Sequence, residues 1–261
     1  MPTVDNGGCE LYYETEGSGP TVAFVGDVGA GAWLWGWQHG AVAGPYEALT
    51  WDLRGTGRSD APDGPYDVRT LAGDLEAVLA DAGVADVHLV GAGLGGMVAL
   101  AHAHRYNRAE SLALIGTAAD GSEVTDRLDD LRADPEDRGA LAGSLSAAFA
   151  ADLDEHPDVR DRIVSWRSED DAGLEGWDAQ AAAMRGFEAP PLYEVTDPAL
   201  VLHGVDDVVV PAEAGEQLAE DLPRGEYRAV EGGHWCLVET SDAVSDALVG
   251  WLDEQSDGNG G

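Results

Sequence analysis

Five short runs of apolar and β-branched residues recur along the chain and predict the strands of a buried sheet. Each run is nearly continuous in apolar residues rather than alternating with polar ones, which is typical of strands covered on both faces. Four of the five runs end in glycine, which marks the turn that follows the strand. The runs are residues 21–26 (TVAFVG), 48–53 (ALTWDL), 87–91 (VHLVG), 111–116 (SLALIG) and 199–204 (ALVLHG).

Helical patterns lie between or after several of these runs. Residues 68–83 place Leu and Val three and four positions apart and end in a glycine, which predicts an amphipathic helix with a C-terminal cap. Residues 96–106, 212–222 and 241–254 are also predicted to be helical. Strand–helix alternation of this kind predicts an α/β fold, with about eight mostly parallel strands and helices on both faces.

The alternation is interrupted between residues 119 and 193, which are rich in Asp, Glu, Ala and Arg and contain no convincing strand. We interpret this stretch as a helical cap inserted between two core strands. The predicted organisation is therefore a core in two parts, residues 1–118 and 194–255, with the cap at 119–193 between them. The polar end, residues 256–261, is expected to be a disordered tail.

The charge balance is extreme and narrows the class of protein. The chain of 261 residues has 14 basic residues, all arginine, against 50 acidic ones, a formal net charge of −36. We expect no nucleic-acid partner, because contacts to phosphate groups need basic patches. No calcium-loop pattern is present, and the diffuse acidity is instead interpreted as adaptation to high salt, where screening weakens self-repulsion.

Neither the start of the chain nor its cysteines indicate export or metal binding. The first residues, MPTVDNGGCE, have no basic and apolar signal-peptide pattern, and no apolar run approaches the ~20 residues of a membrane helix. We therefore expect a cytoplasmic protein with no membrane partner. Cys9 and Cys236 form no metal-ligand or disulfide pattern, so no metal is expected.

The candidate chemistry follows the ends of predicted strands, where ligands bind in sheets of this kind. The strand at 87–91 runs into G-A-G-L-G, a tight turn whose central residue is Gly93. The strand at 199–204 is followed by Asp207, and His234 stands in the later segment VEGGHWCLVE. The order along the chain is a turn residue, an acid and a histidine.

These segments together resemble the α/β-hydrolase superfamily, in particular its small esterase, lactonase and C–C hydrolase-like members. GPTVAFVGDVGAGAW resembles the segment that holds the oxyanion loop, and WDLRGTGRSDAP resembles the D-x-R-G-x-G-x-S turn. GLGGMVALAHAHRYNRAESLALIG resembles the helix after the nucleophile elbow and the next strand. The resemblance covers nearly the whole chain.

The resemblance implies a role for each matching position. In the family an elbow serine attacks an acyl carbon, a histidine accepts its proton and an acid orients the histidine. Carried over by position, Asp207 is the acid and His234 the base. Two backbone N–H groups would hold the oxyanion, those of Leu94 and of Asp27.

The oxyanion loop also includes Gly26, and Trp33 further along it is a candidate for the pocket wall. The resemblance implies a small-molecule substrate and no cofactor. It does not identify the substrate, because the cap carries no readable motif.

Two residues depart from the family pattern. Gly93 occupies the serine position, and no Ser, Cys or Asp lies elsewhere in the elbow. Glycine tolerates the strained backbone that the elbow imposes, so the change relaxes strain as it removes the hydroxyl. Asp27 brings a carboxylate to a position that is usually neutral, where it would oppose a developing oxyanion. Both departures argue against ordinary acyl-enzyme chemistry.

Three hypotheses follow. The chain is an enzyme that uses the Asp207–His234 dyad as a general base, without a covalent intermediate and with hydrolase-like or non-acyl lyase- or oxygenase-like chemistry. Alternatively it is an inactive ligand-binding or interaction protein that kept the fold. The third hypothesis is a serine hydrolase whose nucleophile was removed by design.

Overall fold

An eight-stranded, mostly parallel sheet forms the centre of the computed structural model, which describes residues 2–258. The strand order is β1-β2-β4-β3-β5-β6-β7-β8, and strands β3 to β8 run parallel while β1 and β2 are antiparallel to their neighbours. The predicted fold class is thereby confirmed. The strands are β1 (Thr3–Asp5), β2 (Glu10–Gly17), β3 (Thr21–Val25), β4 (Glu47–Trp51), β5 (Val87–Ala92), β6 (Ala109–Ile115), β7 (Ala199–Gly204) and β8 (Gly225–Val230).

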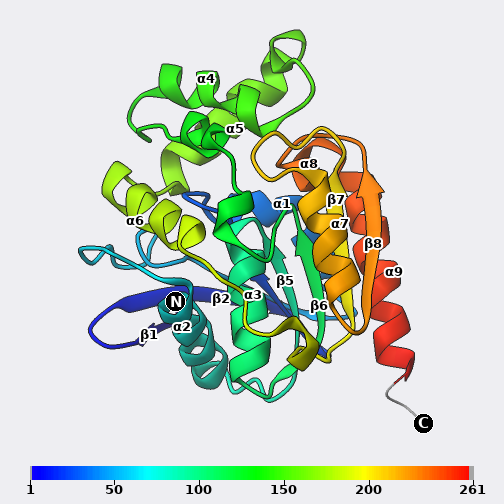
Figure 1. The fold of residues 1–261 in the computed structure, drawn as a ribbon. Coiled ribbons are helices and arrows are strands. Elements are labelled where there is room, and N and C mark those ends of the chain that lie inside the picture. Colours follow the sequence, from blue (N-terminus) through cyan, green and yellow to red (C-terminus); the bar gives the residue numbers. More distant parts are fainter. Residues whose placement is uncertain (1, 259–261) are drawn as a thin grey trace.

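Helices cover both faces of the sheet. Figure 1 shows α2, α3 and α7 on the near face and α9 on the far face, where it packs against α1. The helices are α1 (Gly36–Val42), α2 (Val68–Asp81), α3 (Leu94–Arg105), α4 (Arg138–Ala148), α5 (Pro157–Asp170), α6 (Leu174–Arg185), α7 (Ala212–Asp221), α8 (Cys236–Glu239) and α9 (Ser241–Gly258).

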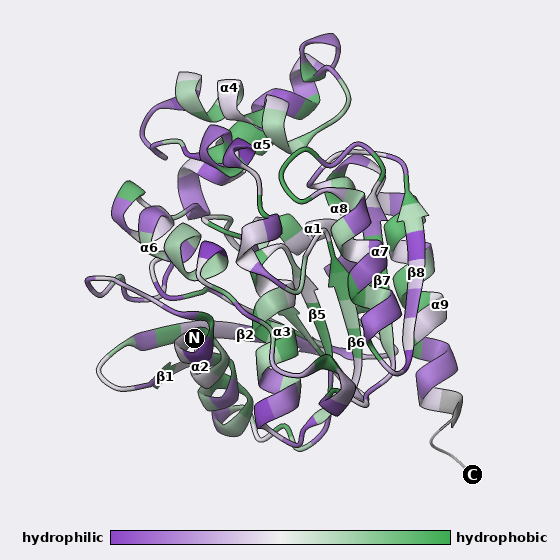
Figure 2. Cartoon of the chain, in the orientation of Figure 1, coloured by the Kyte–Doolittle hydropathy of each residue, from purple (hydrophilic) through white to green (hydrophobic). Residues whose placement is uncertain are grey.

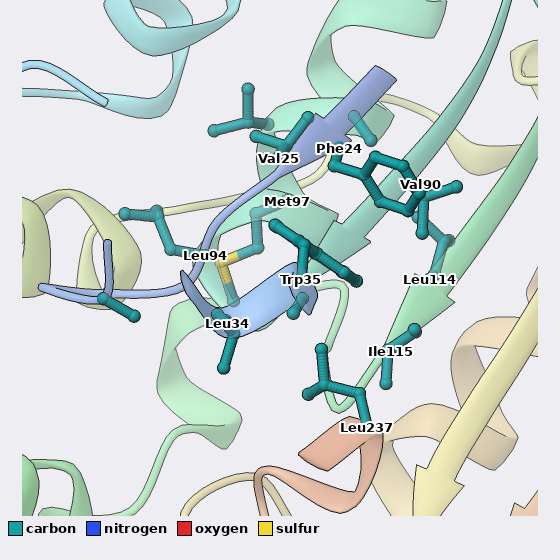
Figure 3. Packing of buried hydrophobic residues seen from close by; sticks show 14 of the residues in the cluster. Phe24, Val25, Leu34, Trp35, Val90, Leu94, Met97, Leu114, Ile115 and Leu237 are labelled. Carbon is teal, nitrogen blue, oxygen red and sulfur yellow. The ribbon is translucent and has the colours of Figure 1, made fainter. Parts of the chain in front are cut away.

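The five apolar runs of the sequence form the buried central strands β3 to β7. Every residue of β3, β5 and β7 is buried, as continuous apolar runs predict for a sheet covered on both sides. Figure 2 shows these strands as predominantly hydrophobic, and Figure 3 shows Phe24, Val90 and Leu114 in the core that they form. Fully burying a side chain of this size contributes roughly 1.5–3 kcal/mol, so these strands hold the strand ends in fixed positions.

The strands that the hydrophobic pattern did not identify lie at the edges of the sheet. β8 has no fully buried residue, and β2 is exposed over Glu14–Gly17, where β4 is the strand it pairs with. An edge strand has one neighbour and is in part covered by solvent, so its sequence carries polar residues and the apolar signal weakens. The C-terminal helix is longer than predicted, since α9 includes residues 256–258 of the expected tail; residues 259–261 lie outside the described part.

The chain between β6 and β7 contains α4, α5 and α6 and lies above the carboxyl ends of the strands in Figure 1. Within the described residues this segment pairs in β fashion only through an isolated bridge between Asp120 and Glu188. α6 contacts α3, and α5 contacts the segment that follows β3. These helices therefore cover the edge of the sheet at which the candidate residues lie. No helix among residues 2–258 is long and apolar enough to span a membrane.

Candidate active site

The turn at Gly93 has the backbone of a sharp strand-to-helix elbow. β5 ends at Ala92, α3 begins at Leu94, and Gly93 between them has φ +50° and ψ −115°. This conformation is accessible to glycine without the penalty that a Cβ would add. The Gly93 carbonyl accepts a hydrogen bond from the Thr117 hydroxyl at 2.7 Å, and its N–H donates to the Ile115 carbonyl at 2.9 Å. The elbow is therefore fixed to the next strand on both sides.

Asp27 fills the space that an elbow side chain would occupy. β3 and β5 are parallel neighbours with Val25 opposite Gly91, so Asp27 and Gly93 both stand two residues beyond the same paired positions. A Cβ built on Gly93 would lie 1.9 Å from the Asp27 Oδ1 atom, which is far inside van der Waals contact. The space next to the elbow is thus occupied by the side chain of Asp27, which comes from the loop after β3.

Four donors hold the Asp27 carboxylate. Oδ1 accepts from the backbone N–H of Val28 at 2.7 Å and from that of Leu94 at 3.1 Å. Oδ2 accepts from His234 Nε2 at 3.0 Å and from Trp235 Nε1 at 3.0 Å. The residue has no solvent exposure. The Leu94 donor predicted for an oxyanion is therefore bonded to a protein carboxylate, and the second N–H beside it is that of Val28 and not, as predicted, that of Asp27.

His234 lies between two carboxylates. Its Nδ1 atom is 2.8 Å from Asp207 Oδ2, which confirms the predicted contact, and its Nε2 atom faces Asp27. The other Asp207 oxygen, Oδ1, accepts from the backbone N–H groups of Val209 and Val210 at 2.8 and 2.9 Å. The neighbouring Asp206 is exposed and makes no such contact. The result is a continuous chain from Asp27 through His234 to Asp207.

The charges of Asp27, His234 and Asp207 stabilise one another. Burial alone would lower the pKa of His234, but the Asp207 and Asp27 carboxylates outweigh it and raise the pKa to about 10. Burial would raise the pKa of each carboxyl, yet the facing His234 cation holds the pKa of both Asp27 and Asp207 below its usual range. At neutral pH the imidazole is therefore a cation that donates to both acids.

The remaining predicted residues support the loop that carries Asp27. Gly26 links β3 to Asp27. Trp33 is largely buried, and its indole N–H donates to Asp171 at 2.7 Å while its ring meets Trp235 edge-on at 5.5 Å. In the same loop the Gly29 N–H donates to Gln180 in α6 at 2.7 Å. The helical segment above the sheet thus holds the Asp27 loop by hydrogen bonds to buried side chains.

Five residues predicted to lie at the same edge of the sheet come together in the structure: Asp207, His234, Leu94, Asp27 and Gly93. Trp235, whose indole donates to Asp27, was not among the predicted site residues. Its position directly after the histidine is the one signal that could have drawn attention to it. Trp33 contacts the ring of Trp235, and it makes no hydrogen bond to Asp27 among the described residues.

A cavity of about 570 Å³ adjoins the Asp207 side of the site. Phe149 and Ser146 line it from the end of α4 and the residue after it, and Val205 and Val208 line it from the loop after β7. Both valines are about half exposed. Asp207 itself belongs to the lining of this cavity. Within residues 2–258 no group of His, Cys, Asp and Glu side chains is arranged to hold a metal ion.

Restoring a serine at the elbow should therefore require removal of Asp27. We expect Gly93→Ser alone to destabilise the protein strongly. The new Cβ would collide with Asp27 Oδ1, and the serine would have to adopt the positive φ of this position. Gly93→Ser with Asp27→Ala should regain stability and hydrolyse 4-nitrophenyl acetate, because the Leu94 and Val28 donors become free. Chemical denaturation and the ester assay measure the two effects. Equal stability of the single and double variants would contradict a clash between the new side chain and Asp27.

Comparison with known proteins gives a consistent result. A family model described as alpha/beta hydrolase fold matches residues 41–240. RutD from Azorhizobium caulinodans, by its name an inferred carbamate hydrolase, is 29% identical over 97% of this chain and 99% of its own length. The enol-lactonase from Burkholderia xenovorans is 27% identical, with a TM-score of 0.86 over 97% of this chain and 100% of its own. A thermophilic esterase from Thermogutta terrifontis is 25% identical, with a TM-score of 0.83 over 97% and 98% of the two chains.

Proposed function

The chain belongs to the α/β-hydrolase fold family, and we propose that it is a small-molecule hydrolase in which the Asp27 carboxylate replaces the elbow serine as the nucleophile. One observation carries this proposal. Asp27 Oδ2 stands 3.0 Å from His234 Nε2 in the volume of the missing elbow side chain. Carboxylates act as nucleophiles in other hydrolases and form covalent intermediates. His234 and Asp207 keep the histidine and acid positions of the family.

In the first step Asp27 Oδ2 attacks an electrophilic carbon of the substrate. The bond from that carbon to its leaving group breaks, and the electron pair departs with the leaving group, which takes the proton from His234 Nε2. Asp27 is then a neutral ester or anhydride and His234 a neutral imidazole. Loss of one of the two carboxylates that raise the pKa of His234 makes the histidine ready to act as a base.

In the second step a water molecule attacks Asp27 Cγ while His234 Nε2 accepts its proton. Charge develops on Oδ1, which the N–H groups of Val28 and Leu94 already hold, so these donors act as the oxyanion hole for the enzyme's own carbonyl. The bond from Cγ to Oδ2 breaks, and the product leaves with Oδ2 and a proton from His234. The new carboxyl proton returns to His234, and the ion pair is restored.

The occupied oxyanion hole is what separates this mechanism from that of a serine esterase. While Asp27 is in place, a substrate carbonyl cannot reach the donors of Val28 and Leu94. The relatives carry names for carbamate, enol-lactone and ester hydrolysis, so we take a small carbamate, lactone or ester as the first substrates to test, with alkyl halides and epoxides as electrophiles that need no oxyanion hole.

The direct test is hydrolysis of this panel by the purified protein at neutral pH. We expect one class to be hydrolysed, and the activity to be lost in His234→Gln, which keeps a hydrogen-bonding side chain but has no titrating group. If no substrate class in the panel is hydrolysed, the proposed function is wrong. His104→Gln is the matched control, because His104 is exposed and pairs with the partly exposed Glu194 at 2.9 Å, away from the site.

A second candidate is the inactive binding protein. The observation in its favour is that all four hydrogen bonds available to the Asp27 oxygens are satisfied within the protein and the residue is fully buried. In that case the Asp27–His234–Asp207 chain is a structural ion network. A dyad that activates water directly is less favoured, because the Asp27 side chain stands between His234 and the elbow. A serine removed by design leaves Asp27 without explanation.

A further inference from the structure

His203, at the end of β7, is buried against the site and takes no part in the steps above. The side chain has no solvent exposure. Its Nε2 atom lies 2.8 Å from the Val210 carbonyl oxygen and 3.3 Å from Asp207 Oδ2. A carbonyl oxygen only accepts, so the proton must reside on Nε2, and the N–H points between these two oxygens.

The hydrogen bonds form a closed ring around the loop that carries Asp207. His203 Nε2–H holds the carbonyl of Val210, and the N–H of Val210 donates to Asp207 Oδ1 at 2.9 Å. The Val210 residue is therefore held at both ends, by His203 on one side and by Asp207 on the other. Removing His203 frees the Val210 carbonyl and loosens the position of the acid.

Two unfavourable features of the structure lie beside this imidazole. Gly215 lies in the middle of α7, where glycine is a poor helix former. A Cβ at this position would lie 2.1 Å from His203 Nδ1. The Nδ1 atom is itself buried without a hydrogen-bond partner in the described chain. Two unfavourable features beside one residue indicate that the ring has a function at this place.

We propose that His203 is a positioning residue that fixes Asp207 against His234. The role in turnover rests on the proposed function, but the positioning itself does not, because it concerns the geometry of the folded protein. The Nε2 side of His203 faces Asp207 and the Val210 carbonyl, and its Nδ1 side faces Gly215 of α7.

The test follows the titration of His234 by NMR in His203→Phe, which keeps a flat ring but removes the N–H. If the ring positions Asp207, the acid moves away and the pKa of His234 falls from about 10 by about one unit. If the His203 N–H only weakens the attraction between Asp207 and His234 by donating to the same carboxylate, its loss strengthens the Asp207–His234 pair and the pKa of His234 rises. A rise or no change overturns the proposal. The readout needs no activity, so it stands whether or not Asp27 proves to be a nucleophile.

His88→Phe is the matched control. His88 is also a buried strand histidine, in β5, and its Nδ1 atom is 2.8 Å from the Ser111 hydroxyl. This variant should lose stability to a similar extent and leave the His234 titration unchanged. A shift of the His234 titration as large as that of His203→Phe would assign the effect to general loosening of the core.

A second variant keeps the test decisive if His203→Phe does not fold. Gly215→Ala pushes the ring away through the new Cβ and should lower the pKa of His234 while His203 is present. In a His203→Val background, where the clash is absent, Gly215→Ala should raise the melting temperature because alanine favours the helix. Lowering of the melting temperature in both backgrounds would show that Gly215 serves another contact and would count against the proposal.

Discussion

Asp27→Ala is expected to lower kcat/KM by at least about 10³-fold on any substrate that the protein hydrolyses, as loss of a nucleophile does in other hydrolases. The substitution removes the carboxylate but leaves the four donors that held it, with His234 and Trp235 among them. Added formate should enter the vacated space, bind the same donors and restore part of the activity. Activity against formate concentration measures the effect.

The control for this variant is Asp86→Ala, which removes an exposed acid before β5 and should leave kcat/KM unchanged within about twofold. Rescue by formate at Asp27→Ala and not at His234→Gln would locate the missing group at Asp27. Full activity of Asp27→Ala without formate would show that the carboxylate only fills space.

His234→Ala is expected to lower the free energy of unfolding by about 3–5 kcal/mol at pH 7, because it leaves two buried carboxylates without their shared cation. The added change Asp27→Asn removes one of those charges and should recover part of the loss. Urea titration measures each variant. Exposed His104→Ala is the control and should change stability by less than about 1 kcal/mol.

The same network predicts the pH dependence of stability. The pKa of His234 is raised, so its contribution is complete below the ordinary histidine value of about 6.5 and is lost as the pH rises through about 10. The pKa of Asp27 and of Asp207 is lowered, so their contribution is present above the ordinary carboxyl range and is lost in acid. The stability that wild type gains over His234→Ala should therefore fall between pH 6.5 and 10. A constant difference across that range would contradict a charged His234.

The hydrophobic pattern predicted the central sheet because β3, β5 and β7 are covered on both faces and so consist of continuous apolar residues. It missed β8, whose sequence GEYRAV reflects an edge position. The helix predicted over residues 68–83 spans Val68–Asp81, and Gly83 adopts φ +74° just after its last turn. Local sequence patterns thus indicate which strands are buried and where a helix ends, because these features can be identified from a few consecutive residues.

The site was predicted only in part. Asp207 and His234 follow strand ends in a familiar order, so their contact could be predicted from position. The partnership of Asp27 and Gly93 depends on the register of β3 and β5, in which Val25 faces Gly91. A prediction of that register would have set the new carboxylate beside the lost side chain. The contact of Trp235 with Asp27 depends on the direction of one side chain, which no sequence pattern indicated.

The most direct test of the nucleophile is a single turnover in water labelled with ¹⁸O, with enzyme in excess over a hydrolysed substrate. If Asp27 forms a covalent intermediate, water attacks its Cγ atom, so the peptide that contains Asp27 gains the label and the first product formed carries none. Mass spectrometry of the digested protein and of the product measures both. An unlabelled Asp27 peptide together with fully labelled product would show that water attacks the substrate carbon and not Asp27 Cγ, and would contradict the second step proposed for Asp27.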